Sequence, residues 1–418
     1  MRIIVFGTYQ ADSHPRIKVL IEGLRLTGHE VVEINEPLGI STAERVSMLQ
    51  KPWTASTLPM KLHSRWWRLW RRGRAERRRR PPEVVLVGYM GHFDVHLARL
   101  VFRGSSIVLD HLVFAAGTAI DRGASTGRLT ALLRLIDQRS LAAADVIVLD
   151  TAEHQAMVPA DFSDRSVVAP VGADAAWFTA GEHAIADPAD DEPVKVVFFG
   201  LYTPLQGAVV IGKALARLVD LGVEGDRISV TMIGAGQDLA KTKLAAGQDA
   251  PVTWLTWVPP SELPNVVALH HIALGIFGTT EKAFNVVPNK VYQAAAAGCA
   301  IVTSDTAPQR RLLEGVAELV PAGDEGALAD VLAELIRDRS LLMQRRRQAQ
   351  SLALNEFSSG AVVASLVAKL TSVSVPERHP ANLSRQASPP LGRDRPPGAS
   401  QEGAERVQRH YEPGGRVD

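Results

Sequence analysis

The sequence predicts an α/β protein built from two Rossmann-like, doubly wound domains, and three observations lead to this fold class. The chain has 418 residues, which is more than one ordinary hydrophobic core accommodates. Short apolar runs alternate with helical patterns through residues 1–173, and a second series of this kind occupies residues 194–355. Residues 174–193, which separate the two series, differ from both in composition.

The first series is expected to begin with a buried strand at Arg2–Phe6 and a helix over Pro15–Thr27. Pro15 suits the first turn of that helix, and Gly28 suits its end. The elements that follow are the strands Val31–Ile34, Val84–Val87, Ile107–Leu109 and Val146–Leu149, and the helices His92–Arg103 and Arg128–Ala143. Alternation of this kind favours a parallel sheet with helices on both faces.

Residues 174–193 are rich in Ala, Asp and Pro and lack sustained periodicity, so we interpret them as an interdomain linker. The strands expected in the second series are Val194–Phe199, Ile228–Ile233, Val252–Leu255, Ile272–Phe277 and Ala300–Thr303. We expect a terminal helix over 356–373 that could return to the first domain. Residues 374–418 contain seven prolines and few large apolar side chains, which predicts a disordered tail.

The composition of the chain limits which partners it can bind and in which cellular compartment it is expected. The net charge of +1 gives no global field that would draw the chain to nucleic acid. A single cysteine, Cys299, excludes an intrachain disulfide and suits a reducing cytosol. The N-terminus has no signal-peptide pattern, and no apolar run approaches the roughly 20 residues that span a bilayer. We therefore expect a cytoplasmic protein whose contact with a membrane, if it has one, is peripheral.

A basic insertion, residues 61–82, lies between the second and third expected strands. Its residues 61–80 hold ten Lys or Arg, one acidic residue and three tryptophans. Leu62, Trp66, Leu69 and Trp70 fall near one face of a helix, as in helices that lie on anionic membranes. A solvated loop with tryptophans folded onto the domain is an alternative. Nucleic-acid binding is another, but no recognisable module surrounds the run.

Candidate site residues in the first series follow strand ends, where ligands bind in such sheets. Asp110 and His111 come directly after a strand and are candidate catalytic residues, although a capping or turn role would equally explain Asp110. Candidate acceptor-binding residues are Gly7, Thr8, His14, Arg16 and His92. Local capping around Pro15 is the alternative for His14 and Arg16.

In the second series, Gly278 and Thr279 give close backbone access after a strand, and Asn289 and Lys290 open the next helix. A cation near a helix N-terminus opposes the helix dipole unless an anion is also present. Lys290 is therefore the best single candidate for a phosphate contact, with a solvated surface lysine as the alternative. No metal-ligand spacing, nucleophile elbow or P-loop occurs, and we expect no metal and no cofactor.

The segment GIFGTTEKAFNVVPNKVYQAAAAGCAIVTSD, residues 275–305, resembles the donor-binding segment of family 4 glycosyltransferases of the GT-B fold. VKVVFFGLYTPLQG (194–207) looks like the first strand and glycine loop of their donor domain, and VTMIGAGQDL (230–239) looks like the second. In the first half, GTYQADSHPRIKVLIEGLRLTGHEVVEI resembles the opening of the acceptor domain. The resemblance covers roughly residues 1–370, and it implies the GT-B fold with a nucleotide-sugar donor.

The chain departs from the family pattern at four positions. Where family 4 enzymes commonly carry two glutamates spaced Glu-x7-Glu, this sequence has Asn285 and Gln293. An amide can still hold a ribose hydroxyl, but it cannot act as a carboxylate. Where the family tends to place Arg and Lys in the first donor-domain loop, this sequence has Leu201 and Gln206. The resemblance therefore implies that Lys290 substitutes for the missing cations.

The resemblance implies a glycosyltransferase, retaining and metal-independent, that takes a sugar from a nucleotide-diphosphate sugar. The acceptor would be a lipid-linked sugar, a polysaccharide of the cell envelope or a small molecule. The donor-binding residues it suggests are Gly200, Gly234, Gly236, Trp257, Gly278, Thr279, Asn285, Asn289, Lys290 and Gln293. One alternative is a GT-B-like nucleotide-binding or scaffold protein with weakened catalysis. A nicotinamide-linked dehydrogenase is disfavoured because Gly234-Ala-Gly236 does not complete G-x-G-x-x-G, and a tight turn explains these glycines equally well.

Overall fold

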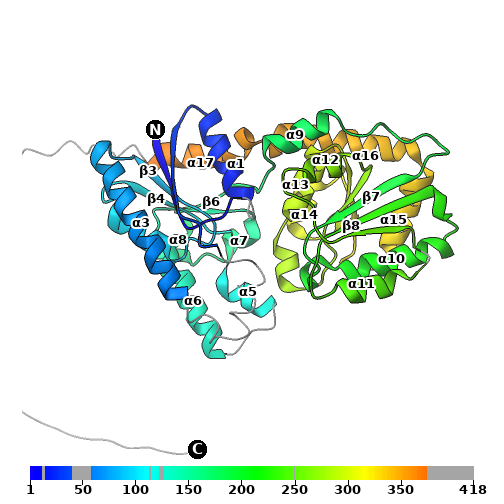
Figure 1. Ribbon diagram of the computed structural model, residues 1–418, viewed down its shortest axis with the longest axis horizontal. Coiled ribbons are helices and arrows are strands. Elements are labelled where there is room, and N and C mark those ends of the chain that lie inside the picture. The colour runs from blue at the N-terminus through cyan, green and yellow to red at the C-terminus, as the bar shows by residue number, and fades with distance from the viewer. Residues whose placement is uncertain (12–14, 40–57, 113, 122–126, 249, 374–418) are drawn as a thin grey trace, which may run out of the picture. The chain divides into compact units, whose positions relative to one another are not determined.

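The computed structural model describes residues 1–373 except 12–14, 40–57, 113, 122–126 and 249. These residues form two parallel sheets, each flanked by helices (Figure 1). The strand order is β2-β1-β3-β4-β5-β6 in the first sheet and β12-β11-β10-β7-β8-β9 in the second. The expected fold class, two Rossmann-like domains, is confirmed. The tail predicted for residues 374–418 lies outside the described residues.

The first sheet and its helices come from residues 2–168. The strands are β1 (Arg2–Gly7), β2 (Glu30–Asn35), β3 (Val84–Val87), β4 (Ser106–Asp110), β5 (Val146–Leu149) and β6 (Ser166–Val168). The helices are α1 (Pro15–Leu26), α3 (Leu58–Arg79), α4 (Asp94–Val101), α5 (Ala115–Asp121), α6 (Gly127–Ala142), α7 (Ala152–Ala156) and α8 (Ala160–Ser163). Strands β3 and β5 are buried along their whole length, as the continuous apolar runs predict.

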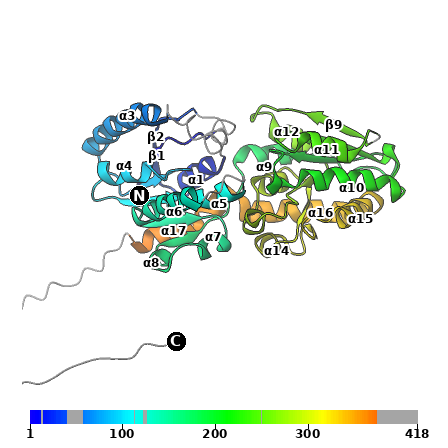
Figure 2. The ribbon, with the colours of Figure 1, turned by 90° about the horizontal axis from the view of Figure 1, so that it is seen from below.

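The second sheet comes from residues 194–320. Its strands are β7 (Val194–Phe199), β8 (Ile228–Ile233), β9 (Val252–Leu255), β10 (Ile272–Leu274), β11 (Ala300–Ser304) and β12 (Glu318–Val320). Its helices are α10 (Ala208–Asp220), α11 (Leu239–Ala246), α12 (Leu263–Ala268), α13 (Asn289–Ala296), α14 (Ala307–Leu313), α15 (Glu325–Arg337) and α16 (Arg339–Leu352). Figure 2 shows α10, α11, α12 and α15 in the half of the chain that contains β9.

The segment that we interpreted as a linker contains a helix, α9 (Ala175–Glu182). The Asp174 carboxylate caps it by accepting a hydrogen bond from the Ala176 amide at 3.0 Å. Trp177 is buried in a core cluster of the second sheet and stacks on Phe199, with ring centroids 5.8 Å apart. The sequence did not reveal this helix, because eight residues make only about two turns and show no clear helical period.

Helix α16 continues through a π-helical turn, Ala353–Phe357, into α17 (Ser359–Val373). By length and composition alone, this run could cross a membrane, since one 18-residue window within Arg339–Ser372 has a mean hydropathy of 1.3. We did not expect such a stretch from the sequence. Composition alone does not make it a span, because α17 packs on α1 and its Val363 and Leu366 lie in the core under the first sheet. The structure thus places the terminal helix against the first sheet.

Helix α3 corrects the orientation that we expected for the basic segment. Leu69 is fully buried, and Trp66 and Trp70 pack against the core of the first sheet. Trp66 Nε1 donates to Asp94 Oδ1 at 2.7 Å. A Cβ atom on Gly73 would lie 2.9 Å from Val101, so glycine allows this close approach to α4. The face that was expected to meet a membrane therefore packs on the domain instead.

Candidate functional site

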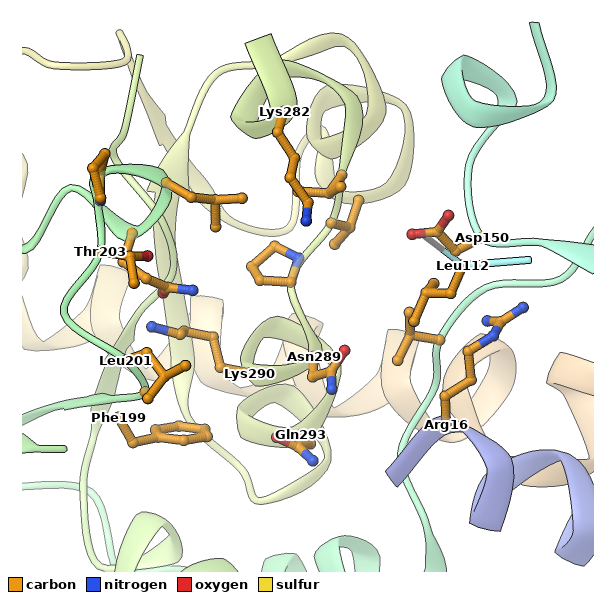
Figure 3. A pocket seen from close by; sticks show the side chains of 18 of the residues that line it. Arg16, Leu112, Asp150, Phe199, Leu201, Thr203, Lys282, Asn289, Lys290 and Gln293 are labelled. Carbon is orange, nitrogen blue, oxygen red and sulfur yellow. The ribbon is translucent and has the colours of Figure 1, made fainter. Parts of the chain in front are cut away.

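A cavity of about 380 Å³ lies at the carboxyl ends of strands from both sheets. Figure 3 shows its labelled side chains, with Lys290, Asn289 and Gln293 on α13 and Arg16 at the start of α1. The residues that line the cavity include Arg16, Tyr89, Asp150, Gly200, Leu201, Gln206, Asn289, Lys290 and Gln293. Five of the predicted site residues are therefore brought together here: Arg16, Gly200, Asn289, Lys290 and Gln293.

Lys290 lies in the first turn of α13, and its side chain is buried. Its Nζ atom has no hydrogen-bond partner among the described residues, and it lies 3.6 Å from the centroid of the Phe198 ring. Burial lowers the pKa of Lys290 well below its usual value. Keeping a positive charge buried beside aromatic rings alone costs free energy, so a bound anion would stabilise the charged form of this lysine.

Gly200, at the end of β7, brings Lys290 close to the loop that follows the strand. A Cβ atom on Gly200 would lie 3.2 Å from Lys290 Nζ and 3.6 Å from Gln206 Oε1. Gln206 Oε1 is also buried without a hydrogen-bond partner in the described part of the chain. The cavity wall thus holds, beside Gly200, a donor and an acceptor that have no hydrogen-bond partner among the described residues. Such an arrangement suits a ligand with anionic oxygens and hydroxyl groups.

Gly234 serves the same loop structurally. A Cβ atom on Gly234 would lie 1.9 Å from the Gly200 carbonyl oxygen, so the two loops can meet only with glycine there. Neither Gly234 nor Gly236 lines the cavity. Of the two interpretations of these glycines, the tight turn accounts for what the structure shows.

Two amide side chains, Asn289 and Gln293, lie one turn apart on α13 and face the cavity (Figure 3). Gln293 and Asn285 are the two positions that match glutamates of the family pattern, and Asn285 makes structural hydrogen bonds instead of facing the cavity. Its Nδ2 donates to the Glu281 carbonyl at 3.0 Å, and its own carbonyl accepts from Thr151 Oγ1 at 2.8 Å. Asn285 does not line the cavity, so Gln293 is the amide placed to meet a ligand.

Arg16 lines the opposite side of the cavity and is held by three hydrogen bonds. Its Nε donates to Asp110 Oδ1 at 2.7 Å, and its Nη1 donates to the carbonyls of Ala169 and Pro170 at 2.9 and 3.0 Å. Its Nη2 is buried and has no partner among the described residues. Asp110 itself does not line the cavity, so the structure gives this predicted catalytic residue the task of orienting Arg16.

Asp150 and Tyr89 line the cavity and were not predicted. Asp150 directly follows β5, and Asp110 is the last residue of β4, so the rule that singled out Asp110 at the end of a strand would also have found Asp150. The Asp150 carboxylate lies 2.5 Å from His154 Nδ1, one turn along the chain. This contact fixes the carboxylate at the cavity edge, where it can accept a hydrogen bond from a ligand hydroxyl.

His92, His111 and Asp137 form a buried cluster away from the cavity lining. Their ligand atoms all lie within 4.8 Å of one another, and two imidazoles with a carboxylate are ligand types that could hold a metal ion. Asp137 Oδ1 already lies 3.0 Å from both His92 Nε2 and the Ala115 amide. Burial lowers the pKa of His111 to about 3, so the imidazole is neutral at ordinary pH.

The remaining predicted residues lie elsewhere. Thr8 donates to Asp94 Oδ2 through its amide at 2.7 Å and its hydroxyl at 2.8 Å, which orders the loop after β1. Trp257 is exposed, and His14 lies outside the described residues. The predicted residues that are described but absent from the cavity lining are Gly7, Thr8, His92, Asp110, His111, Gly234, Gly236, Trp257, Gly278, Thr279 and Asn285.

Residues 193–338 match the family described as glycosyl transferases group 1. The second domain is a group 1 glycosyltransferase domain. This match, with the fold, confirms the resemblance and the expected class of enzyme, a glycosyltransferase of EC class 2.4. The match covers the strands and helices that carry Gly200, Gln206 and Lys290. No curated protein matches the sequence significantly.

Solved structures similar to this glycosyltransferase share its fold along most of both chains. A sucrose-phosphate synthase from Thermosynechococcus elongatus has a TM-score of 0.63 at 12% identity, covering 89% of this chain and 99% of that one. Anabaena HepE in complex with UDP-glucose has a TM-score of 0.61 at 13% identity, covering 89% and 100%. An α,α-trehalose-phosphate synthase (UDP-forming) from Burkholderia vietnamiensis has a TM-score of 0.58 at 15% identity, covering 89% and 99%. At such identities the likeness shows the fold alone.

In this glycosyltransferase three of the four departures from the family pattern, Leu201, Gln206 and Gln293, line one cavity. Leu201 and Gln206, at the positions where the family tends to carry cations, line the same cavity as Lys290. Lys290 comes from α13 rather than from the loop, yet its Nζ reaches the loop beside Gly200. Lys290 Nζ thus lies beside the loop that carries Leu201 and Gln206.

Proposed function

We propose that the protein transfers a sugar from a nucleotide-diphosphate sugar to an acceptor, with retention of configuration and without a metal ion. The observation that carries the proposal is the buried Nζ of Lys290 at the cavity wall, which has no hydrogen-bond partner among the described residues. A departing nucleoside diphosphate develops negative charge, and a preorganised cation is the usual means of stabilising it. The structure of HepE holds UDP-glucose, so UDP-sugars are the donors to test first.

The donor would lie against the second domain. Its diphosphate would meet Lys290 and the N-terminal turn of α13, where the helix dipole adds to the attraction for an anion. Gln293 and Asn289 would offer amide groups to hydroxyls of the ribose or the sugar. Burial of the diphosphate beside Lys290 excludes water and strengthens each of these contacts.

The acceptor would approach from the side of Arg16, Tyr89 and Asp150. Asp150 is the carboxylate placed to accept a hydrogen bond from an acceptor hydroxyl, and Arg16 Nη2 offers a free donor. The position of Lys290 at the expected diphosphate supports the proposal that no metal ion is needed. Transfer should therefore proceed at an unchanged rate in the presence of EDTA.

The direct test is a titration of the purified protein with UDP, GDP and ADP, followed by thermal unfolding and hydrogen exchange. One of these nucleotides is expected to stabilise the fold, by about 2.7 kcal/mol at 100 times its dissociation constant. Protection should appear at residues 194–355. Protection confined to residues 1–173 would contradict the placement of the donor.

A second candidate function is nucleotide binding without transfer. The observation that favours it is the pair of amides, Asn285 and Gln293, at positions where the family commonly has glutamates. Release of UDP from UDP-glucose distinguishes the two. A protein that binds the nucleotide but releases none above the uncatalysed background, with water or with simple sugars as acceptor, is a binding protein.

A further inference from the structure

Helix α3 presents one continuous row of side chains away from the first sheet. The row consists of Met60, Ser64, Trp67, Arg71, Arg74 and Arg78, spaced alternately by four and three residues, and we call it the outer stripe. This spacing keeps side chains on one face of a helix, and at 1.5 Å per residue the stripe is about 27 Å long. All six side chains are classed as exposed. In both Figure 1 and Figure 2, α3 lies along the outside of its own half of the chain.

The two faces of α3 have different partners. On the inner face, Leu69 is buried and Arg77 Nη1 donates to the Val101 carbonyl at 3.0 Å. At the edge of the helix, Arg72 pairs with Glu36 at 2.7 Å. On the outer stripe, Arg71, Arg74 and Arg78 are exposed and form no ion pair with a carboxylate in the described part of the chain. The Arg74 guanidinium lies 4.7 Å from the centroid of the Trp70 ring.

Large apolar side chains accompany these charges. Met60 is 74% exposed and Trp67 is 52% exposed, although large apolar side chains of this kind are usually buried. The Arg71 guanidinium lies 4.9 Å from the centroid of the Trp67 ring, which holds the indole and the charge side by side. An exposed tryptophan next to cations is the combination found in segments that enter the headgroup region of a bilayer.

We propose that the outer stripe of α3 docks the protein on an anionic lipid bilayer. Arg71, Arg74 and Arg78 would meet lipid phosphates, while Trp67 and Met60 enter the boundary between headgroups and acyl chains. The helix stays packed on the first sheet throughout, because its other face is occupied by the core. This docking does not depend on the sugar-transfer activity proposed above.

The test is co-sedimentation with vesicles of phosphatidylcholine alone or with phosphatidylglycerol, at low and high salt. The protein is expected to sediment with the anionic vesicles and to be released by salt. The triple variant R71S/R74S/R78S should lose on the order of 100-fold in partition coefficient, given the contribution of each basic residue near such a surface. The matched control K213S/K241S/K243S removes the same charge from exposed positions of the second domain and should bind as the original protein does.

Tryptophan fluorescence tests the depth of insertion. Anionic vesicles should shift the emission to the blue, and W67F should lose that shift whereas W70F, altered on the inner face, should keep it. Both variants are checked by circular dichroism for an intact fold. Equal binding to neutral and anionic vesicles, unchanged binding of the triple variant, or tight binding of a DNA duplex in place of vesicles would each overturn the proposal.

Discussion

Lys290 and Arg16 are both buried cations that line the same cavity, yet the structure treats them in opposite ways. Arg16 has a carboxylate at 2.7 Å and two backbone carbonyls, so its charge is compensated within the protein. Lys290 Nζ has neither a carboxylate nor a carbonyl among the described residues. The difference indicates that Arg16 is fixed in place before any ligand arrives, whereas Lys290 is left in need of one.

The largest expected effect comes from removing the partner of Arg16. Asp110→Ala should lower the free energy of unfolding by about 3–5 kcal/mol, because it leaves a buried guanidinium uncompensated. Urea unfolding measures this loss. Glu325→Ala, which removes the half-buried partner of the exposed Lys213, should cost no more than about 1 kcal/mol. Similar losses in the two variants would show that Arg16 and Asp110 are not a buried pair in solution.

Replacing Lys290 should have opposite effects on binding and on stability. Lys290→Met is expected to weaken nucleoside diphosphate binding tenfold or more, about 1.4 kcal/mol or above, through loss of a charge-assisted contact. The same variant should raise the melting temperature of the free protein, since it replaces an unpaired buried amine with an apolar chain. Calorimetric titration and thermal unfolding measure the two effects.

Lys241→Met is the matched control for that variant, because Lys241 is exposed on α11 and lies outside the cavity lining. It should leave binding unchanged. A Lys290→Met protein that binds nucleotide as tightly as the original would place this lysine outside the donor site, whatever its effect on stability.

A smaller effect concerns protons. Burial lowers the pKa of Lys290 in the free protein, and a bound diphosphate should raise it again. Between the lowered pKa and the pKa of the complex, binding then takes up a proton, so affinity should fall as the pH rises through that window. Titrations in two buffers of different ionisation enthalpy report the number of protons. Lys290→Met should abolish the uptake, and persistence of the uptake in that variant would assign it to another group.

Lys290 also determines the direction in which the free energy of unfolding changes with pH. A lysine whose pKa is lower folded than unfolded binds fewer protons in the folded state, so the free energy of unfolding rises with pH across the interval. The free protein should therefore become more stable between the lowered pKa of Lys290 and its ordinary value of about 10.4. Comparison of the unfolding free energy of the original protein and of Lys290→Met across this range isolates the contribution.

The sequence by itself determined the alternation of strands and helices. Continuous apolar runs such as Val84–Val87 and Val146–Leu149 are a local signal, and the structure has strands at those residues. Strands β6 and β12 were missed because each is three residues long, too short for any period to appear. The expected strand Ile272–Phe277 is shorter in the structure and ends at Leu274.

Lys290 was found from the sequence because its place at a helix N-terminus conflicts with the helix dipole, and that conflict is local. Asp110 was assigned to catalysis on its place after a strand, but only the structure shows that its carboxylate turns to Arg16, 94 residues away in sequence. The direction of a side chain at the end of a strand depends on which partner the folded chain places next to it. Pairs so distant in sequence leave no periodic signal.

Helix α3 shows the same limit on the scale of a whole element. Its composition indicated an amphipathic, basic helix, but tryptophans lie on more than one side of it, and composition does not say which side meets the protein. Packing decided this, because Gly73 lets the helix approach α4 closely and Trp66 finds the Asp94 carboxylate. Local sequence therefore determined that a basic helix forms, whereas burial against neighbours distant in the chain determined which of its faces remains free.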